Sequence, residues 1–400
     1  MWHCRHFLLS SRAASLSARR SRTAAAAAAA SVAAGIAALP GHCSAALEAA
    51  RVAPSIGEYN ANDPIEDRHM VKETAKGDLL AAVFDGHGGW QAADFAQKRL
   101  ASVVQLELSN SLAQTPDQIS GALSRAFLRV EREFLYQVQS AFELGFGDVA
   151  RSGACALFAM IRGDNLFVAN AGDCRAVLGR RAEDGTARME AVALSNDHNA
   201  REPAEQAKLR ALHPTEEDII RCKRATSCYV KGRLQPTRSL GDAYLKYSEF
   251  NREAGAHRSA GRHLPPPYTP PYITADPEVQ HHAIDRAVDE FVVLASDGLW
   301  DYLSNEEAVA IVGAAALDAG NPRGASDALI REVLERAARH HAVEGGAESL
   351  RKLPGGRARR GKHDDLTCVV IYLADKGAHN GGGDAAVAVT HDASPAALPP

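Results

Sequence analysis

Apolar runs that predict buried strands alternate with amphipathic segments along the middle of the chain. The clearest apolar runs lie at 79–84, 155–161, 166–170, 174–179, 291–295 and 366–373. Short turns separate the runs between 155 and 179, so we expect these three strands to form a meander. Another short segment, 65–71, follows polar turn residues at 57–64.

Helical spacing of apolar residues predicts a long amphipathic helix that starts after Thr115. Thr115, Pro116 and Gln118 form a capping box with proline at the first helical position. Further helices are expected at 90–109 and 200–212, and two more within 305–340. Strands joined by short turns, together with long amphipathic helices, favour a sheet sandwich covered by helices over an alternating parallel fold.

Two long stretches interrupt this rhythm inside the domain that we expect at 48–375. Residues 213–236 are polar and mixed, and residues 243–271 end in the proline-rich run LPPPYTPP, which must be extended. We expect both to be inserted loops, which at this length are usually functional or mobile. Glycine, alanine and proline dominate residues 376–400, which predicts a disordered tail.

The first 47 residues differ in charge from the rest of the chain. They contain five arginines and no acid, and the first acidic residue is Glu48. A start rich in Arg, Ser and Ala and free of acids is typical of an organelle transit peptide, so we expect residues 1–47 to direct the chain to the mitochondrial matrix. The uncharged run 24–39 is shorter than the roughly 20 residues that a membrane-spanning helix needs. Inner-membrane association, another organelle or a plain disordered leader are the alternatives.

Composition narrows the class of protein further. The hydrophobic fraction of 46% supports a sizeable core, and the mild net charge of -4 argues against binding of nucleic acid or of a membrane surface. The seven cysteines are scattered and form no Cys-x-x-Cys pair. The sequence therefore predicts neither a disulfide framework nor a zinc site, and it fits a reducing compartment.

Acidic residues recur at the ends of the predicted strands. They are Glu66 and Asp67, Asp85, Asp173, Asp297, and Asp364 and Asp365. Buried carboxylates repel one another and must be paired or neutralised, yet few bases lie nearby in the sequence: Arg68, His69, Arg175 and His363. We therefore predict bound metal ions, and oxygen ligands favour magnesium or manganese over zinc. For the Asp85–Gly86 pair taken alone, a solvated polar turn is the alternative.

Seven segments resemble, in family order, the motifs of the metal-dependent protein phosphatases of type 2C. They are 66-ED-67, 84-FDGHGG-89, 152-SGAC-155, 169-ANAGDCRAVLG-179, 238-RSLGD-242, 296-SDGLWD-301 and 364-DDLT-367. The resemblance covers about residues 57–375. It implies an α+β fold in which an antiparallel β-sandwich is flanked by helices on both faces, in four layers.

The resemblance also implies a set of metal ligands. It places two Mg²⁺ or Mn²⁺ ions, and a weaker third, on these groups: Asp85 bridging both ions, the Gly86 carbonyl, Asp297 and Asp364 on the second ion, Glu66 and Asp67 directly or through water, and Asp173 and Asp301 on the third. Every side chain in this set is an acid. The set therefore argues against a catalytically weak relative that serves only as a docking module.

The same resemblance implies a mechanism for phosphoserine and phosphothreonine hydrolysis. A hydroxide that bridges the two ions would attack phosphorus, and His87 would protonate the departing oxygen. A core or solvated His87 is the alternative. Many family members grip the phosphate with an arginine where this chain has Asn62, so Arg68 and Arg238 become candidates for that task. A buried structural ion pair is the alternative for Arg238.

Four segments suggest a branch of the family and therefore a substrate. The segments 63-DPIEDR-68, 197-DHNA-200, 212-LHP-214 and 270-PPYITADPEV-279 most resemble the mitochondrial pyruvate dehydrogenase phosphatases. That resemblance makes the phosphorylated E1α subunit of the pyruvate dehydrogenase complex the expected partner. Another organellar phosphoprotein is the alternative, with residues 213–271 docking a large complex. The sequence identifies no regulatory subunit.

One motif suggests a different chemistry. Cys174 and Arg180 have the Cys-x5-Arg spacing of cysteine-dependent phosphatases. The phosphate loop of those enzymes needs successive backbone amides that open a helix, whereas residues 176–178 predict a strand. We therefore expect that Cys174 is not a nucleophile.

Overall fold

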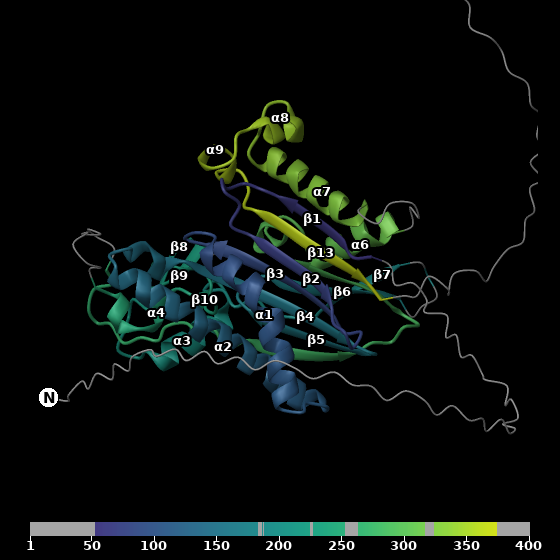
Figure 1. Cartoon of the computed structure of the whole chain (residues 1–400). Coiled ribbons are helices and arrows are strands. Elements are labelled where there is room, and N and C mark those ends of the chain that lie inside the picture. Colours follow the sequence, from purple (N-terminus) through teal and green to yellow (C-terminus); the bar gives the residue numbers. More distant parts are fainter. Residues whose placement is uncertain are drawn as a thin grey trace, which may run out of the picture. The chain divides into compact units, whose positions relative to one another are not determined.

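Two antiparallel sheets packed face to face form the centre of the protein (Figure 1). The computed structural model describes residues 53–182, 186, 188–224, 227–252, 263–316 and 324–373. The leader and the tail predicted at 1–47 and 376–400 lie outside the described residues.

We name each sheet after one of its central strands. The β12 sheet has the order β1 (Ser55–Tyr59), β13 (Leu366–Tyr372), β12 (Asp289–Ala295), β6 (Arg175–Arg181) and β7 (Met189–Ala193). The β3 sheet has the order β11 (Glu278–Ala283), β5 (Asn165–Ala171), β4 (Gly153–Arg162), β3 (Leu79–His87) and β2 (Arg68–Glu73), and β10 (Leu240–Gly241) pairs with β4. Every one of these neighbouring pairs is antiparallel.

Alternate residues of the central strands fill the space between the sheets. Ala81 and Val83 of β3 face Val292 and Leu294 of β12 within one buried cluster. Their neighbours in the chain point to the outer faces, as the two-residue period of a strand requires. This alternation explains why the central strands read as uninterrupted apolar runs in the sequence.

Helices cover both outer faces. The β3 sheet packs against α1 (Gln91–Asn110) and α2 (Pro116–Glu143), and the β12 sheet packs against α6 (Asn305–Ala316) and α7 (Gly324–His340). The predicted capping box at Thr115 is present. The structure confirms the predicted α+β sandwich with helices on both faces.

Two of the predicted elements were wrong. β6 does not continue a meander with β4 and β5, because it pairs with β12 and β7 in the other sheet. The segment after Tyr59 is a turn as expected, but residues 55–59 form β1, which pairs with β13. Gly57 made this strand look like a turn; any side chain there would collide with Ser326 and Ile330 of α7.

The two inserted regions contain short elements as well as loops. In the first, β8 (Ile220–Arg224) and β9 (Ser227–Val230) form a hairpin. A disulfide joins Cys222 to Cys228 across this hairpin, which the cysteine spacing did not predict. It joins two cysteines six positions apart on neighbouring strands and therefore links no distant elements of the chain.

The remaining short elements of the described chain are η1 (Gly147–Arg151), α3 (Pro203–Leu212), α4 (Ala243–Lys246), η2 (Ser248–Phe250), α5 (Asp297–Trp300), α8 (Gly346–Lys352) and α9 (Arg357–Arg360).

Candidate metal centre

A loop anchored by Asp365 brings the first pair of predicted ligands to the end of the sandwich. Asp365 accepts hydrogen bonds from the backbone N–H groups of Ala61 (2.6 Å), Asn62 (2.8 Å) and Glu66 (2.8 Å). Glu66 and Asp67 therefore lie just before β2, not inside a strand as the sequence predicted. Asp67 accepts a hydrogen bond of 2.8 Å from the Ser296 hydroxyl, which fixes its carboxylate beside the end of β12.

Two Asp–Gly pairs occupy equivalent positions on the two sheets. Asp85–Gly86 lies just before His87, the last residue of β3, and Asp297–Gly298 begins α5 one residue after the end of β12. A Cβ atom at Gly86 would overlap the carbonyl of Glu66, and a Cβ atom at Gly298 would overlap that of Asp365. Each glycine thus lets an acid-bearing loop lie directly against the strand end.

The two aspartates converge with a third. Asp85, Asp173 and Asp297 each place one carboxylate oxygen within 4.8 Å of the others. Asp173 is buried in the crossing from β5 to β6, where it accepts hydrogen bonds from the Asn199 amide (2.6 Å) and the Cys155 thiol (3.1 Å). The structure therefore brings together predicted ligands from three distant parts of the chain.

The other predicted ligands surround this group. Asp301 ends the first turn after Asp297, with its N–H bonded to the Asp297 carbonyl at 2.8 Å, and its side chain is half exposed. Asp364 immediately precedes Asp365 and accepts the N–H of that residue at 2.8 Å.

The carboxylates carry strongly shifted pKa values. Burial, together with the charge of Asp297, raises the pKa of Asp85 well above its usual range, and burial with the charge of Asp173 does the same to the pKa of Asp297. Burial raises the pKa of Asp67 to about 8 and that of Asp364 to about 6. Without cations these carboxyl groups thus resist ionisation, and a bound cation would favour their ionised forms.

Protein cations reach only the edge of this cluster. Arg360 contacts Asp364, and Arg201 lies 3.7 Å from Asp301. Across the part of the chain that the structure describes, no ion pair reaches Asp67, Asp85 or Asp297. Arg175, one of the few bases near the acids in the sequence, does not neutralise Asp173, because it binds Asp197 at 2.7 Å. Carboxylate oxygens gathered without cationic partners fit Mg²⁺ or Mn²⁺.

His87 lies two residues beyond Asp85 and has a partner that the sequence analysis missed. Its Nε2 is 2.7 Å from the carboxylate of Asp242, which also accepts a hydrogen bond of 2.7 Å from the Ser239 hydroxyl. Burial lowers the pKa of His87, but the charge and hydrogen bond of Asp242 outweigh it and raise that pKa. The sequence analysis identified the motif 238-RSLGD-242, which contains Asp242. Nothing in the motif indicated that Asp242 contacts a residue 155 positions earlier in the chain.

A buried ion pair holds the turn that carries Asp242. Glu131 of α2 accepts hydrogen bonds from Lys246 (2.6 Å) and from the Gly241 N–H (2.7 Å), and Lys246 also donates to the Ser239 carbonyl (2.7 Å). Asp242 itself has φ +49°, a left-handed conformation that is uncommon for residues other than glycine. The hydrogen bonds of Glu131 and Lys246 hold the turn in that conformation. The unusual conformation indicates a functional role for Asp242.

The two arginines that we considered for phosphate binding are engaged elsewhere. Arg68 donates to the carbonyls of Ile65 (2.9 Å) and Asp67 (2.7 Å) and lies over the Trp90 ring. Arg238 donates to the Asp276 carbonyl at 2.9 Å, so the buried ion pair considered as its alternative role is not found among the described residues. The Asn62 side chain donates to Asp365 at 3.0 Å.

Cys174 lacks the surroundings of a nucleophile. The residue is fully buried directly before β6, and burial raises the pKa of its thiol well above the usual range. Arg180, the other residue of the Cys-x5-Arg spacing, pairs with Asp289 at 2.7 Å. A thiol that stays protonated cannot attack phosphorus.

We expect the Cys174→Ser variant to keep phosphatase activity within about threefold of the original. Serine is close in size to cysteine, and the thiol takes no part in the metal centre. The measurement is kcat/KM on a phosphoserine peptide, with circular dichroism as the check on folding. A folded but inactive variant would restore the cysteine mechanism.

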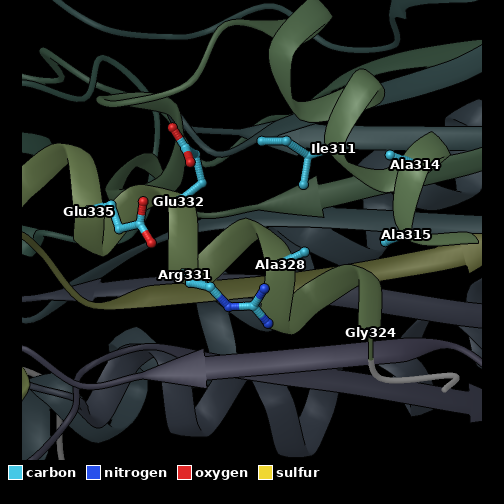
Figure 2. A pocket seen from close by; sticks show the side chains of 8 residues that line it. All are labelled: Ile311, Ala314, Ala315, Gly324, Ala328, Arg331, Glu332 and Glu335. Atoms are coloured by element: carbon cyan, nitrogen blue, oxygen red, sulfur yellow. The ribbon is translucent and has the colours of Figure 1, made fainter. Parts of the chain in front are cut away.

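A separate cavity lies away from these residues. It has a volume of about 590 Å³ and opens between α6 and α7, with Arg331, Glu332 and Glu335 along one side (Figure 2). No predicted site residue lines it. This cavity is therefore separate from the acid cluster and His87.

Comparison with known proteins gives a consistent result. The family model described as protein phosphatase 2C matches residues 58–342. "Probable protein phosphatase 2C 61" of Oryza sativa subsp. japonica is 36% identical over 319 residues, which are 80% of this chain and 81% of that protein. "Probable protein phosphatase 2C 48" of Arabidopsis thaliana is 36% identical over 327 residues, 80% of each chain.

A solved structure is similar in fold. The serine-threonine phosphatase 2C from Toxoplasma gondii superposes with a TM-score of 0.53 at 18% sequence identity. The alignment covers 80% of this chain and 94% of that one. At this identity the likeness concerns the arrangement of sheets and helices alone.

Proposed function

This chain belongs to the protein phosphatase 2C family and is a metal-dependent protein serine/threonine phosphatase, and we propose that it acts on a mitochondrial phosphoprotein. The first candidate is the phosphorylated E1α subunit of the pyruvate dehydrogenase complex. One observation supports the phosphatase activity most directly. One carboxylate oxygen each of Asp85, Asp173 and Asp297 lies within 4.8 Å of the others, without a cationic partner among the described residues.

The acid cluster fits the metal ions that the family uses. Magnesium or manganese would be held by these groups: Asp85, the Gly86 carbonyl, Asp297 and Asp364, with Glu66 and Asp67 directly or through water, and Asp173 and Asp301 at a weaker site. When bound, such ions activate water for attack on phosphorus and neutralise the phosphate oxygens.

His87 donates a proton to the serine or threonine oxygen as its bond to phosphorus breaks. A serine or threonine alkoxide is a poor leaving group, so a protonated imidazole beside it lowers the barrier. Asp242 holds the ring by its Nε2 and favours the charged form of His87. After losing a proton to the departing oxygen, His87 recovers one from solvent, since a quarter of its side chain is exposed.

The pyruvate dehydrogenase substrate is supported by four segments of sequence. One of them, 197–200, lies beside the acid cluster in the structure: Asp197 binds Arg175, and Asn199 binds Asp173. A second, 270–279, contributes Glu278, which lies 3.3 Å from His198. The segment 197–200 therefore contributes to the surroundings of the acid cluster. Another organellar phosphoprotein is the alternative substrate.

The substrate proposal is tested by comparing two phosphoproteins. The full chain with Mn²⁺ should dephosphorylate phosphorylated E1α at least about tenfold more efficiently, in kcat/KM, than an unrelated mitochondrial phosphoprotein. Equal efficiencies would show that E1α is not the preferred substrate. No release from either protein, with release from a phosphoserine peptide, would point to a different phosphoprotein.

We propose that the leader of this chain directs it to the mitochondrial matrix. Residues 1–47 carry five arginines and no acid. None of the helices that the structure describes is both long and apolar enough to cross a bilayer. A reporter fused behind residues 1–47 should enter mitochondria, whereas a version with the five arginines changed to glutamine should not. A reporter found throughout the cytosol would refute the targeting role.

A further inference from the structure

A dense run of positive charge lies beside the metal centre. Residues 351–362, which we call the basic segment, contain six cations and no acid, in a chain with a net charge of -4. The six are Arg351, Lys352, Arg357, Arg359, Arg360 and Lys362. The segment runs from the end of α8 through α9, and the chain then enters β13 directly after Asp364 and Asp365 (Figure 1).

Arg359 fixes the basic segment in place. It is buried and donates hydrogen bonds to the carbonyls of Asn60 (2.8 Å), Arg351 (3.1 Å) and Leu353 (3.1 Å). The Gly356 N–H adds a bond of 2.7 Å to the Ala61 carbonyl. The basic segment is thus held against the loop that leads to Glu66 and Asp67, so little ordering is needed when a ligand binds.

Most of the other cations face solvent without a strong partner. Arg351 and Arg357 are exposed, and neither makes an ion pair with any described residue. Lys352 has one contact, 3.8 Å to Glu348, and about three quarters of each side chain is exposed. An uncompensated group of this kind attracts anionic partners over several ångströms.

Arg360 connects this surface to the metal centre. Its guanidinium contacts the carboxylate of Asp364, and about half of the side chain is exposed. Arg357 lies three positions earlier on α9, so the two project from neighbouring points of one helical turn. Residues that flank a phosphoserine at the metal centre would therefore pass within reach of Arg357.

We propose that the basic segment binds acidic side chains that flank the phosphoserine of the substrate protein. Arg360 holds the residues next to the phosphoserine, and Arg357 and Arg351 hold acids farther along the substrate. The inference rests on the proposed function for its kinetic consequence but not for binding itself. Because the contacts are exposed ion pairs, the preference weakens as ionic strength rises.

The first test measures binding without catalysis. The probe is a fluorescent peptide with four acidic residues and an unphosphorylated serine, titrated with the full chain by anisotropy, and the control peptide has alanines at the acidic positions. The acidic peptide should bind about tenfold more tightly, because each exposed ion pair contributes a factor of up to about five. Equal affinity for both peptides would overturn the proposal.

The second test uses variants and phosphorylated forms of the two peptides. The double variant Arg351→Gln/Arg357→Gln, which keeps Arg360, should lower the ratio of their kcat/KM values from about ten to about two, mainly through KM. The double variant Arg351→Lys/Arg357→Lys keeps the charges and should keep most of the preference. Arg125→Gln, which removes a similarly exposed arginine from α2, should leave the ratio unchanged.

The outcomes separate this inference from the proposed function. Hydrolysis of neither phosphopeptide, with normal anisotropy binding, would count against the phosphatase activity and leave the basic segment supported. Hydrolysis of both at equal rates in all variants would refute the acidic preference. Binding of the chain to phosphatidylserine vesicles through Arg351 and Arg357, with no peptide preference, would assign the surface to a membrane and also overturn the proposal.

Discussion

The Asp85→Asn variant is expected to lose metal affinity and nearly all phosphatase activity while it keeps its fold. Asparagine matches aspartate in size but removes the charge that a bound cation would need. Loss of that charge should lower kcat by about 10³-fold or more, since metal ions supply several kcal/mol of stabilisation to the transition state. The surrounding strand is unaffected, because Leu80, Ala82 and Phe84 remain packed under α1 and α2.

The measurement is kcat on a phosphoserine peptide at saturating Mn²⁺, with thermal unfolding of the metal-free proteins as the check on folding. Asp297→Asn should behave in the same way, because Asp297 belongs to the same group of acids. Asp164→Asn, an exposed aspartate in the turn between β4 and β5, serves as the matched control and should retain full activity. A folded Asp85→Asn protein with normal kcat would show that Asp85 is a solvated turn residue.

The His87→Ala variant is expected to lose activity in a way that depends on the leaving group. Removing a general acid costs about 10²- to 10⁴-fold in rate on a phosphoserine peptide. The loss should be far smaller on an aryl phosphate, because a phenolate departs without needing a proton. The two substrates therefore distinguish a proton donor from a metal ligand, whose loss lowers both rates alike.

Asp242 contacts His87, so variants of Asp242 test the same proton transfer from His87 to the leaving oxygen. Asp242→Asn keeps an acceptor for the Ser239 hydroxyl but removes the charge opposite the imidazole. Its rate loss should be smaller than that of His87→Ala and should show the same dependence on the leaving group. An equal loss on aryl phosphate and phosphoserine peptide for His87→Ala would remove His87 from the acid role.

Much of the sandwich could be predicted because its signals are local. The strand ends at Asp85 and Asp297 share an apolar run followed by Asp–Gly, and both glycines prove to be needed for close approach of a loop. The helix that starts at Thr115 has its cap, proline and apolar spacing within a few residues of one another. In each case neighbouring residues carry the information.

The parts that could not be predicted depend on distant partners. β6 is apolar on both faces, so its pattern fits either sheet, and only its pairing with β12 decides between them. The contact between His87 and Asp242 and the anchoring of Asn62 by Asp365 join segments 155 and 303 positions apart. The contact of Arg360 with Asp364 joins residues only four positions apart, but Asp364 lies beyond the end of α9, so no helical spacing predicts the contact.

Titration of the metal-free protein with Mn²⁺ in a calorimeter tests the central claim most directly, because it needs no substrate and no assumption about the reaction. Asp85, Asp297 and their neighbouring acids should bind at least two ions per chain in the original protein. Asp85→Asn should lose most of the heat of binding, and Asp164→Asn should lose none. Two ions bound with equal affinity by the original protein and by Asp85→Asn would contradict the account.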